Sequence, residues 1–278
     1  MDFGFSVKEA VVKRYSCRTY DNKPLGAEVK NKLLSYAETL QNPFGPKIRV
    51  QLIEKESAAN AKKLGTYGVI NGASTYLGVT VVDAPMALEA LGYDFEQLVL
   101  YATSMGLGTC WLGGTFSRSA FTEAMEIREG ELFPILSPIG YPATRKSLAE
   151  KIMRTAVKAG SRQPWEKLFY KNNFNTPLVQ EESGEYGFPL EMLRLAPSAV
   201  NGQPWRVVIE EDKVHFYKKH SATSELSGLD MQRIDMGIAM CHFDMAAKEQ
   251  GMRGSFVMEE PRIKAPSDLR YTASWIRE

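Results

Sequence analysis

The hydrophobic positions of the chain follow helical spacing in some segments and form short apolar runs in others. Val29 to Leu40 has apolar residues every three or four positions, and Pro189 to Leu195 begins a helix of the same kind. A proline-containing turn and a strand follow each helix, at Ile48 to Ile53 and at Arg206 to Ile209. The second strand continues through a polar turn into Val214 to Tyr217 as a hairpin. The pattern therefore predicts a helix, a turn and a strand, in that order, at two places in the chain.

Two further helices, predicted over Asp94 to Met105 and Met236 to Glu249, are apolar on almost every side. A helix without a polar face is expected to be buried. Tyr76 to Val82 is predicted as another strand, and Leu132 to Ile139 is a further apolar run. Buried helices beside separate strands indicate an α+β protein.

The two helix-turn-strand units belong to a longer internal repeat. YDNKPL, from Tyr20 to Leu25, matches NFNTPL, from Asn173 to Leu178, and AETLQNPFGPKIRVQLI matches APSAVNGQPWRVVI. GYDFEQLVLYATSMGLG matches GIAMCHFDMAAKEQGMRG at one constant offset. Because the three matches occur in the same order, we expect two tandem similar halves, packed about a pseudo-two-fold axis like the subunits of a homodimer.

The N-terminal half is expected over residues 1–150 and the C-terminal half over residues 151–278, and together they would form one compact unit. The expected seam is the polar, helical segment from Lys151 to Gln163. Two halves that already cover a dimer-like interface have less need of a partner chain, so we expect a monomer.

Composition argues against several classes of function. The 278 residues are 44% hydrophobic and 24% charged, with a formal net charge of +1, which is typical of a globular protein and favours neither a nucleic-acid nor a membrane partner. The N-terminal sequence has no basic region followed by an apolar core, and no stretch is apolar enough to span a membrane, so we expect a cytoplasmic protein. The cysteines and histidines lack metal-ligand spacing, so no metal site is expected.

Two segments of the N-terminal half carry clustered positive charge. KRYSCRTY places Arg14, Ser16 and Arg18 at alternate positions, where two guanidinium groups and a hydroxyl can converge on one phosphate. GYPATRKS places Arg145 and Lys146 just after a turn. On local grounds alone, the first segment could also be the solvated end of a helix, and the second a surface turn.

Two other segments have unusual backbone or polar content. In GLGTCWLGG, Gly113 and Gly114 follow Leu112 and allow the main chain to approach a flat or bulky group closely; a tight loop without a ligand is the alternative. APSAVNGQPW holds polar side chains between two prolines, with Trp205 expected in the core, and could also be only a helix stop.

Motifs of catalysis by protein side chains are missing from the sequence. It contains no G-x-S-x-G element, no Walker loop, no H-E-x-x-H motif and no Cys/His pair in a catalytic context. If the protein is an enzyme, a cofactor is therefore expected to supply the chemistry.

Together these segments resemble the nitroreductase family of flavin oxidoreductases. RYSCRTYDNKPL, APSAVNGQPWRVVI, the helix that runs into GLGTCWLGG, and GYP followed by basic residues are similar to the R-x-S-x-R, A-P-S-x-x-N-x-Q-P-W, G-L-G and G-Y-P elements of that family. Its members are α+β homodimers that bind FMN at the subunit interface with residues from both subunits. Because the elements are divided between the two halves, the chain resembles the branch in which two nitroreductase-like halves are fused.

The resemblance implies one FMN per chain, bound across the halves, with the phosphate held by the first half and the flavin N5 edge beside the glycine loop. The cofactor-binding residues that it implies are Arg14, Ser16, Arg18, Leu112, Gly113, Gly114, Arg145, Lys146, Pro197, Ser198, Ala199, Asn201 and Gln203. The mirror-image site would be lost, because KLFYKNNFNTPL has no arginine and AETLQNPFGP has no A-P-S.

The implied activity is hydride transfer from NADH or NADPH to FMN, and then to a small acceptor such as a nitroaromatic or a quinone, by a ping-pong cycle. No side chain is expected to be catalytic, and Lys62 and Lys63 are candidates, by position only, for the cation at the flavin N1/O2 edge. Two alternatives stay open: a flavin-binding or ligand-binding protein that does not turn over, and a pseudo-enzyme without flavin.

Overall fold

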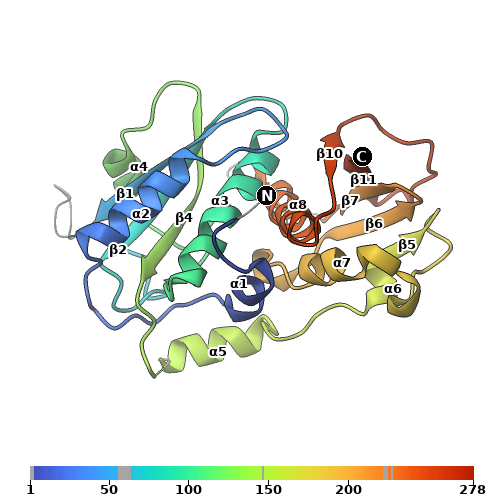
Figure 1. Cartoon of the computed structure of the whole chain (residues 1–278). Helices are drawn as coiled ribbons and strands as arrows, with labels where there is room; N and C mark the ends of the chain where they lie inside the picture. Colours follow the sequence, from blue (N-terminus) through green and yellow to red (C-terminus); the bar gives the residue numbers. More distant parts are fainter. Residues whose placement is uncertain (1–2, 56–63, 146, 222–224, 227) are drawn as a thin grey trace.

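Two β-sheets flank a central pair of long helices in the computed structural model, which describes residues 3–55, 64–145, 147–221, 225–226 and 228–278 (Figure 1). The central helices are α3 (Ala87–Ser104) and α8 (Gln232–Glu249). The other helices are α1 (Val7–Lys13), α2 (Ala27–Glu38), α4 (Arg118–Met125), α5 (Leu148–Ala156), α6 (Trp165–Leu168) and α7 (Gly187–Arg194).

Both sheets are largely antiparallel. The first has the strand order β1-β2-β4-β3, and the second has the order β10-β11-β7-β6-β5, in which only β5 and β6 are parallel. A short hairpin of β8 and β9 lies just before α8. The strands are β1 (Ile48–Glu54), β2 (Thr75–Val82), β3 (Gly108–Thr109), β4 (Glu131–Gly140), β5 (Phe169–Lys171), β6 (Trp205–Glu210), β7 (Lys213–Lys219), β8 (Glu225–Leu226), β9 (Leu229–Asp230), β10 (Gly254–Val257) and β11 (Leu269–Arg277).

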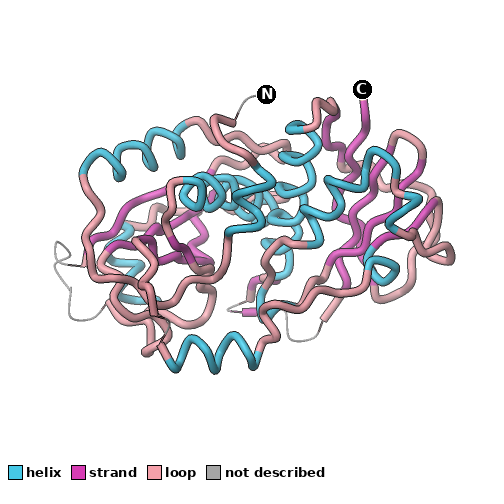
Figure 2. The backbone as a smooth tube through the Cα atoms, turned by 60° about the horizontal axis from the view of Figure 1, so that its bottom comes forward, coloured by secondary structure: helices cyan, strands magenta, loops and turns pink. Residues whose placement is uncertain are grey.

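The same strand order occurs in both sheets when elements are matched by their order in the chain. β1, β2, β3 and β4 correspond to β6, β7, β10 and β11, and in each set a long helix follows the second strand. Figure 2 shows the two groups of strands on opposite sides of the central helices. The α+β architecture with two similar halves, predicted from the internal repeat, is confirmed.

The two central helices cross through a reciprocal pair of glycines. A Cβ atom on Gly92 of α3 would lie 2.2 Å from the carbonyl oxygen of Ile234, and one on Gly237 of α8 would lie 2.1 Å from that of Glu89. Each glycine therefore faces the carbonyl group of the residue three positions before the other glycine, as a two-fold axis between the helices requires. Only glycine allows the two backbones to approach this closely.

The central helices begin earlier than the sequence pattern predicted. α3 starts at Ala87, where the expected start was Asp94, because a run of small and apolar helix-forming residues precedes the acid. α8 starts at Gln232, where the expected start was Met236; the backbone N–H of Gln232 donates to Oδ1 of Asp230 at 3.1 Å, which satisfies one of the amide groups at this helix end.

Other local predictions are close to the structure. The predicted strands agree with β1, β2, β6 and β7 to within a residue at most ends, and Trp205 is fully buried in the core, as expected. α5 runs through the expected boundary between residues 150 and 151, so the division of the chain at that point stays a prediction. No helix in the described ranges is long and apolar enough to cross a membrane.

Candidate functional site

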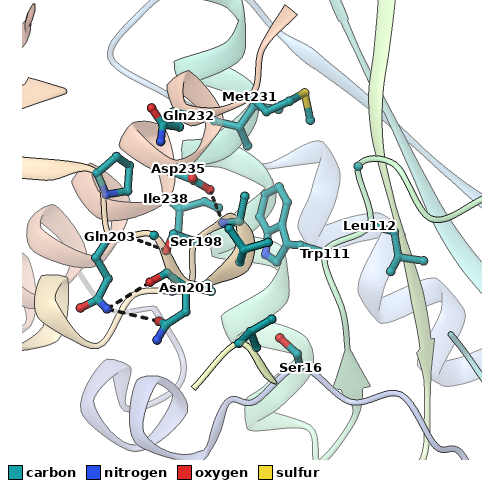
Figure 3. A pocket seen from close by; sticks show the side chains of 18 of the residues that line it. Ser16, Trp111, Leu112, Ser198, Asn201, Gln203, Met231, Gln232, Asp235 and Ile238 are labelled. Carbon is teal, nitrogen blue, oxygen red and sulfur yellow. Dashed lines mark hydrogen bonds between the residues drawn. The ribbon is translucent and has the colours of Figure 1, made fainter. Parts of the chain in front are cut away.

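A cavity of about 820 Å³ lies where segments of both halves meet. Its walls come from the end of α1, the loop after β3, the α5–α6 connection, the turn that precedes β6, and the first turns of α8. Figure 3 shows Ser16 and Trp111 of the first half facing Ser198, Asp235 and Ile238 of the second, while the side chain of Leu112 points away from them. A pocket of this size, lined by apolar and a few polar groups, is large enough for a small planar ligand.

Most of the predicted site residues line this one cavity although they are far apart in the chain. They are Arg14, Ser16, Arg18, Leu112, Gly113, Gly114, Pro197, Ser198, Ala199, Asn201 and Gln203. Arg145 does not line it: the chain turns outward after the Tyr20–Pro142 bridge and leaves Arg145 exposed. Lys146, Lys62 and Lys63 lie outside the described residues.

Arg14 is a buried cation at the wall of the cavity. It follows α1 as the C-cap residue, and its Nε atom lies 3.8 Å from Oε1 of Glu96, which is too far for a hydrogen bond. That Nε atom has no hydrogen-bond partner in the described part of the chain. Burial lowers the pKa of Arg14, and the charge of Glu96 opposes this shift. A positive group held in this way favours an anion beside it.

Glu96, on α3, connects Arg14 to the rest of the interior. It is fully buried and accepts hydrogen bonds from Nε1 of Trp111 at 2.8 Å. Its other oxygen lies 2.9 Å from Nε2 of His242 on α8, whose Nδ1 donates to the carbonyl oxygen of Met192. One carboxyl group thus orients both a cavity-lining arginine and a cavity-lining tryptophan.

Two arginines that the sequence analysis did not single out also line the cavity. The guanidinium of Arg154, on α5, lies 5.5 Å from the centre of the Tyr15 ring. Arg162 donates to the carbonyl oxygens of Ala159 and Leu195, while its Nε atom is buried without a partner among the described residues. Both lie in or beside the polar segment that was interpreted as a seam, and its repeated positive charges were the available signal.

The arginines act on one another electrostatically. Burial, together with the charges of Arg14 and Arg194, lowers the pKa of Arg162 to about 10. Arg18 also has a buried Nε atom without a partner in the described ranges. Like charges that gather around a shared space, with N–H groups left unused, are the usual preparation for a phosphate or another anion.

The turn from Pro197 to Gln203 uses its polar side chains mainly to hold its own shape. Oγ of Ser198 accepts from the backbone N–H of Gln203 at 2.9 Å, and Nδ2 of Asn201 donates to the carbonyl oxygens of Lys158 and Ser161. Oε1 of Gln203 accepts from the backbone N–H of Gln163 at 2.8 Å. These bonds tie the turn to the α5–α6 connection rather than leaving the side chains free for a ligand.

The backbone of this turn is strained. Val200, Asn201 and Gln203 have φ angles of 46°, 59° and 48°, in the left-handed region that a β-branched residue such as valine rarely adopts. The hydrogen bonds of Asn201 and Gln203 offset this cost and keep the turn against the cavity. Strain of this kind is found at binding sites more often than elsewhere.

The glycine loop of the first half closes the opposite wall. Leu112 pairs with Leu136 of β4 through two backbone hydrogen bonds, and Arg118 donates to the carbonyl oxygen of Gly113 at 2.8 Å. In the described part of the chain, the amide N–H of Gly113 has no hydrogen-bond partner. A Cβ atom at Gly113 would lie 3.1 Å from Cε of Met231 in the second half, so the two halves already approach closely here.

The first turn of α8 contributes polar groups that the sequence analysis missed. Asp235 is 5% exposed; its Oδ1 accepts from the backbone N–H of Ala199 at 3.0 Å, and its Oδ2 has no partner in the described ranges. Burial raises the pKa of Asp235 from 3.8 to about 8; the bond from Ala199 opposes the shift and the charge of Asp230 adds to it. The signal in the sequence for this residue was an acid directly before a predicted helix that is apolar on almost every side.

Aromatic rings occupy the position that the pseudo-two-fold axis relates to the cavity. Phe44 lies in the turn that matches Pro197 to Gln203, and its ring centre lies 5.6 Å from that of Phe256 on β10 and 5.8 Å from that of Tyr93. Phe44 is 7% exposed. The turn that contains Phe44 is therefore packed against other side chains, whereas the turn from Pro197 to Gln203 borders a cavity. No group of three or more potential metal ligands occurs in the described ranges.

Comparison with known proteins agrees with this architecture. Residues 6–247 match the model of the family described as "Putative TM nitroreductase". A putative nitroreductase from Thermotoga maritima is 21% identical, with a TM-score of 0.62, over 98% of this chain and 94% of that one.

Shorter chains also match. A nitroreductase family protein from Clostridium difficile is 22% identical, with a TM-score of 0.44, over 59% of this chain and 95% of that one. A nitroreductase with bound FMN from Bacteroides fragilis is 18% identical, with a TM-score of 0.39, over 52% and 92%. No curated protein matches the chain. The family match spans most of the sequence, and the chain therefore belongs to the nitroreductase family that this model describes.

Proposed function

We propose that the protein is an FMN-dependent oxidoreductase that takes a hydride from NADH or NADPH and passes it to a small acceptor such as a nitroaromatic or a quinone. The observation that carries the proposal is the cavity between the halves, in which buried arginine N–H groups without partners face a strained turn and a glycine loop. Family membership supports the same chemistry.

The arginines would hold the phosphate of FMN. Arg14, Arg18 and Arg162 keep buried Nε atoms without partners in the described part of the chain, and Arg154 completes the positive wall. A dianionic phosphate would offset the repulsion between these guanidinium groups and accept their unused N–H groups, in charge-assisted hydrogen bonds. Ser16, between Arg14 and Arg18, would add a hydroxyl donor.

The rest of the cavity suits a planar ring system. Trp111, Ile238 and Met231 offer apolar surface, and the unused amide N–H of Gly113 is a backbone donor of the kind expected at the flavin N5 edge. Bound FMN would supply the two-electron chemistry by accepting and donating a hydride. The chain's part is to bind and orient the ring, and to place positive charge and N–H donors beside it.

One experiment separates this proposal from its alternatives. Purified protein is reconstituted with FMN, freed of unbound flavin, and mixed anaerobically with NADH or NADPH while the flavin absorbance is followed. We expect bound flavin that bleaches with the donor and recovers when a quinone or nitroaromatic is added. Bound flavin that never bleaches would leave only a flavin-binding role, and protein that binds no FMN would exclude both.

A further inference from the structure

We propose that Asp235 is held as a neutral carboxylic acid whose Oδ2–H donates a hydrogen bond to a carbonyl-type oxygen of the molecule bound in the cavity. The inference rests on the proposed function, because the bound molecule is taken to be either the flavin or the acceptor. Both offer such an oxygen: the flavin through the carbonyl groups of its pyrimidine ring, and the acceptor through a quinone or nitro group.

The geometry assigns the proton to Oδ2. Oδ1 of Asp235 already accepts the backbone N–H of Ala199 at 3.0 Å, so this oxygen acts as the carbonyl end of the acid. Oδ2 is buried and has no partner among the described residues. Because Asp235 lines the cavity from the first turn of α8, the unused O–H is the group available to a ligand there (Figure 3).

The surroundings of Asp235 keep the acid neutral. Among the residues that the structure describes, the nearby cations are paired elsewhere: Arg233 is held by Glu89 of α3, and Lys218 of β7 is held by Asp230. Asp230 is a like charge, and burial is the largest cause of the raised pKa, about 8. The cavity is also lined by Glu225 of β8, by Lys219, which pairs with Asp268, and by His220, Tyr15 and the arginines.

Gln232 lies one helical turn before Asp235 and lines the same cavity. Its Oε1 atom is also buried without a partner in the described part of the chain. A carboxamide beside an acid O–H offers both an acceptor and a donor within one turn of helix. The pair therefore suits a ring edge on which a carbonyl oxygen lies next to an N–H or a second oxygen.

Replacement of Asp235 by asparagine gives a sharp test, because an Asn side chain can still accept from Ala199 and can still donate from Nδ2, but it cannot ionise. FMN affinity is measured by quenching of flavin fluorescence at pH 7 and pH 9. If the donor faces the flavin, wild-type affinity should fall about tenfold between these values, the cost of one lost hydrogen bond, while the affinity of Asp235→Asn stays level.

A second arm identifies the partner. Binding of 1,4-naphthoquinone to the oxidised, FMN-loaded protein is followed by perturbation of the flavin absorbance, without any NAD(P)H. If the donor faces the acceptor, the same contrast between wild type and Asp235→Asn appears for the quinone, and FMN affinity is level in both proteins. A difference in pH dependence between wild type and Asp235→Asn in either arm supports the inference. The arm in which it appears shows whether the flavin or the acceptor carries the oxygen that Asp235 recognises.

The matched control is Asp94→Asn. Asp94 is a second buried acid, on α3, with a pKa raised by burial to about 7, but it accepts from Asn42 and does not line the cavity. This variant should follow wild type in both arms.

The inference is overturned if no contrast appears in either arm, or if Asp235→Asn loses affinity at pH 7, since that would mean that the negative charge of the carboxylate is needed. Wild-type protein that binds no FMN would overturn the proposed function together with it. Wild-type protein that binds FMN and bleaches, with Asp235→Asn indistinguishable from it, would overturn this inference alone.

Discussion

Single residues in the cavity are held in states that cost free energy when the cavity has no ligand. Arg14 and Arg162 are buried cations that repel each other and leave N–H groups unused, and Asp235 is a buried acid with one unused oxygen. Unpaired buried polar groups usually cost about 1–3 kcal/mol each. A ligand that accepts or donates these unused hydrogen bonds would offset this cost, which is why such residues mark the site more strongly than the motifs do.

Arg154 provides the first prediction at this scale. We expect Arg154→Gln to weaken FMN binding by about tenfold, because a charge-assisted hydrogen bond to phosphate is lost. Riboflavin, which lacks the phosphate, should bind the variant as well as it binds wild type. Arg145→Gln is the control, since Arg145 is exposed outside the cavity. Equal losses for FMN and riboflavin in parallel fluorescence titrations would contradict a phosphate role for Arg154.

The second prediction at this scale concerns the effect of Asp235 on the stability of the ligand-free protein. Its pKa is 3.8 ordinarily and about 8 in the folded protein, so the folded state binds more protons than the unfolded state between these values. Stability is therefore lost as the pH rises through this window and is constant above it. Asp235→Asn cannot ionise, so its Tm should exceed that of wild type at pH 9, and the difference should shrink towards pH 5. A difference that is the same at every pH would show that Asp235 is already ionised when folded.

At the scale of elements, the crossing of α3 and α8 is the contact on which the two halves depend. It is made by Gly92 and Gly237, each against a main-chain carbonyl group of the other helix. The same helices carry Asp235, which lines the cavity, and Glu96, which lies behind Arg14 and Trp111 of its wall, so the crossing also sets the distance between the two sides of the site.

We expect Gly237→Ala to lower the free energy of unfolding by about 1–3 kcal/mol, because the added Cβ would lie 2.1 Å from the carbonyl oxygen of Glu89 and the helices would have to separate. Urea denaturation measures this loss. Gly160→Ala is the comparison, because nothing lies within 4 Å of a Cβ at that position and its backbone needs no positive φ. Similar stabilities for the two variants would mean that the central helices can shift without cost.

At the scale of the whole molecule, the two halves share the arrangement of their strands but differ at the two turns that the pseudo-two-fold axis relates. Both sheets keep one strand order, but one turn borders a cavity and the other is filled by Phe44 against Phe256 and Tyr93. Arg14, Arg18, Arg154 and Arg162 line the cavity beside the first turn. Within the described residues, the two halves thus share their packing but differ at these two places.

We therefore expect one FMN per chain, with the chain as a monomer. Flavin absorbance of reconstituted protein against protein concentration gives the ratio, and light scattering gives the mass. Phe44→Ala should destabilise the protein by about 3 kcal/mol, as for other buried aromatic rings, without adding a second flavin. A ratio of two in wild type or in this variant would contradict the loss of the mirror-image site.

Patterns in the chain were enough for the paired helix-turn-strand units and their duplication, because hydrophobic spacing and turn residues act locally and survive in each half, but they did not predict α4, β10 or β11. The R-x-S-x-R and A-P-S segments were likewise visible as short motifs, and the structure brings most of their residues to one cavity. Arg145 lies outside the cavity, because a motif gives the sequence neighbourhood of a side chain but not the side of the turn on which it lies.

Only the tertiary structure decided which groups share the cavity and in what state. Arg154 and Arg162 belong to the polar segment from Lys151 to Gln163, and Asp235 lies at the start of a buried helix; the sequence shows their charges there but not that these side chains share a cavity. Burial leaves some of their hydrogen-bonding atoms without partners among the described residues. Burial and neighbours more than a helix away in the chain also shift the pKa values of Arg162 and Asp235. Those quantities depend on distances through space, which a linear pattern does not contain.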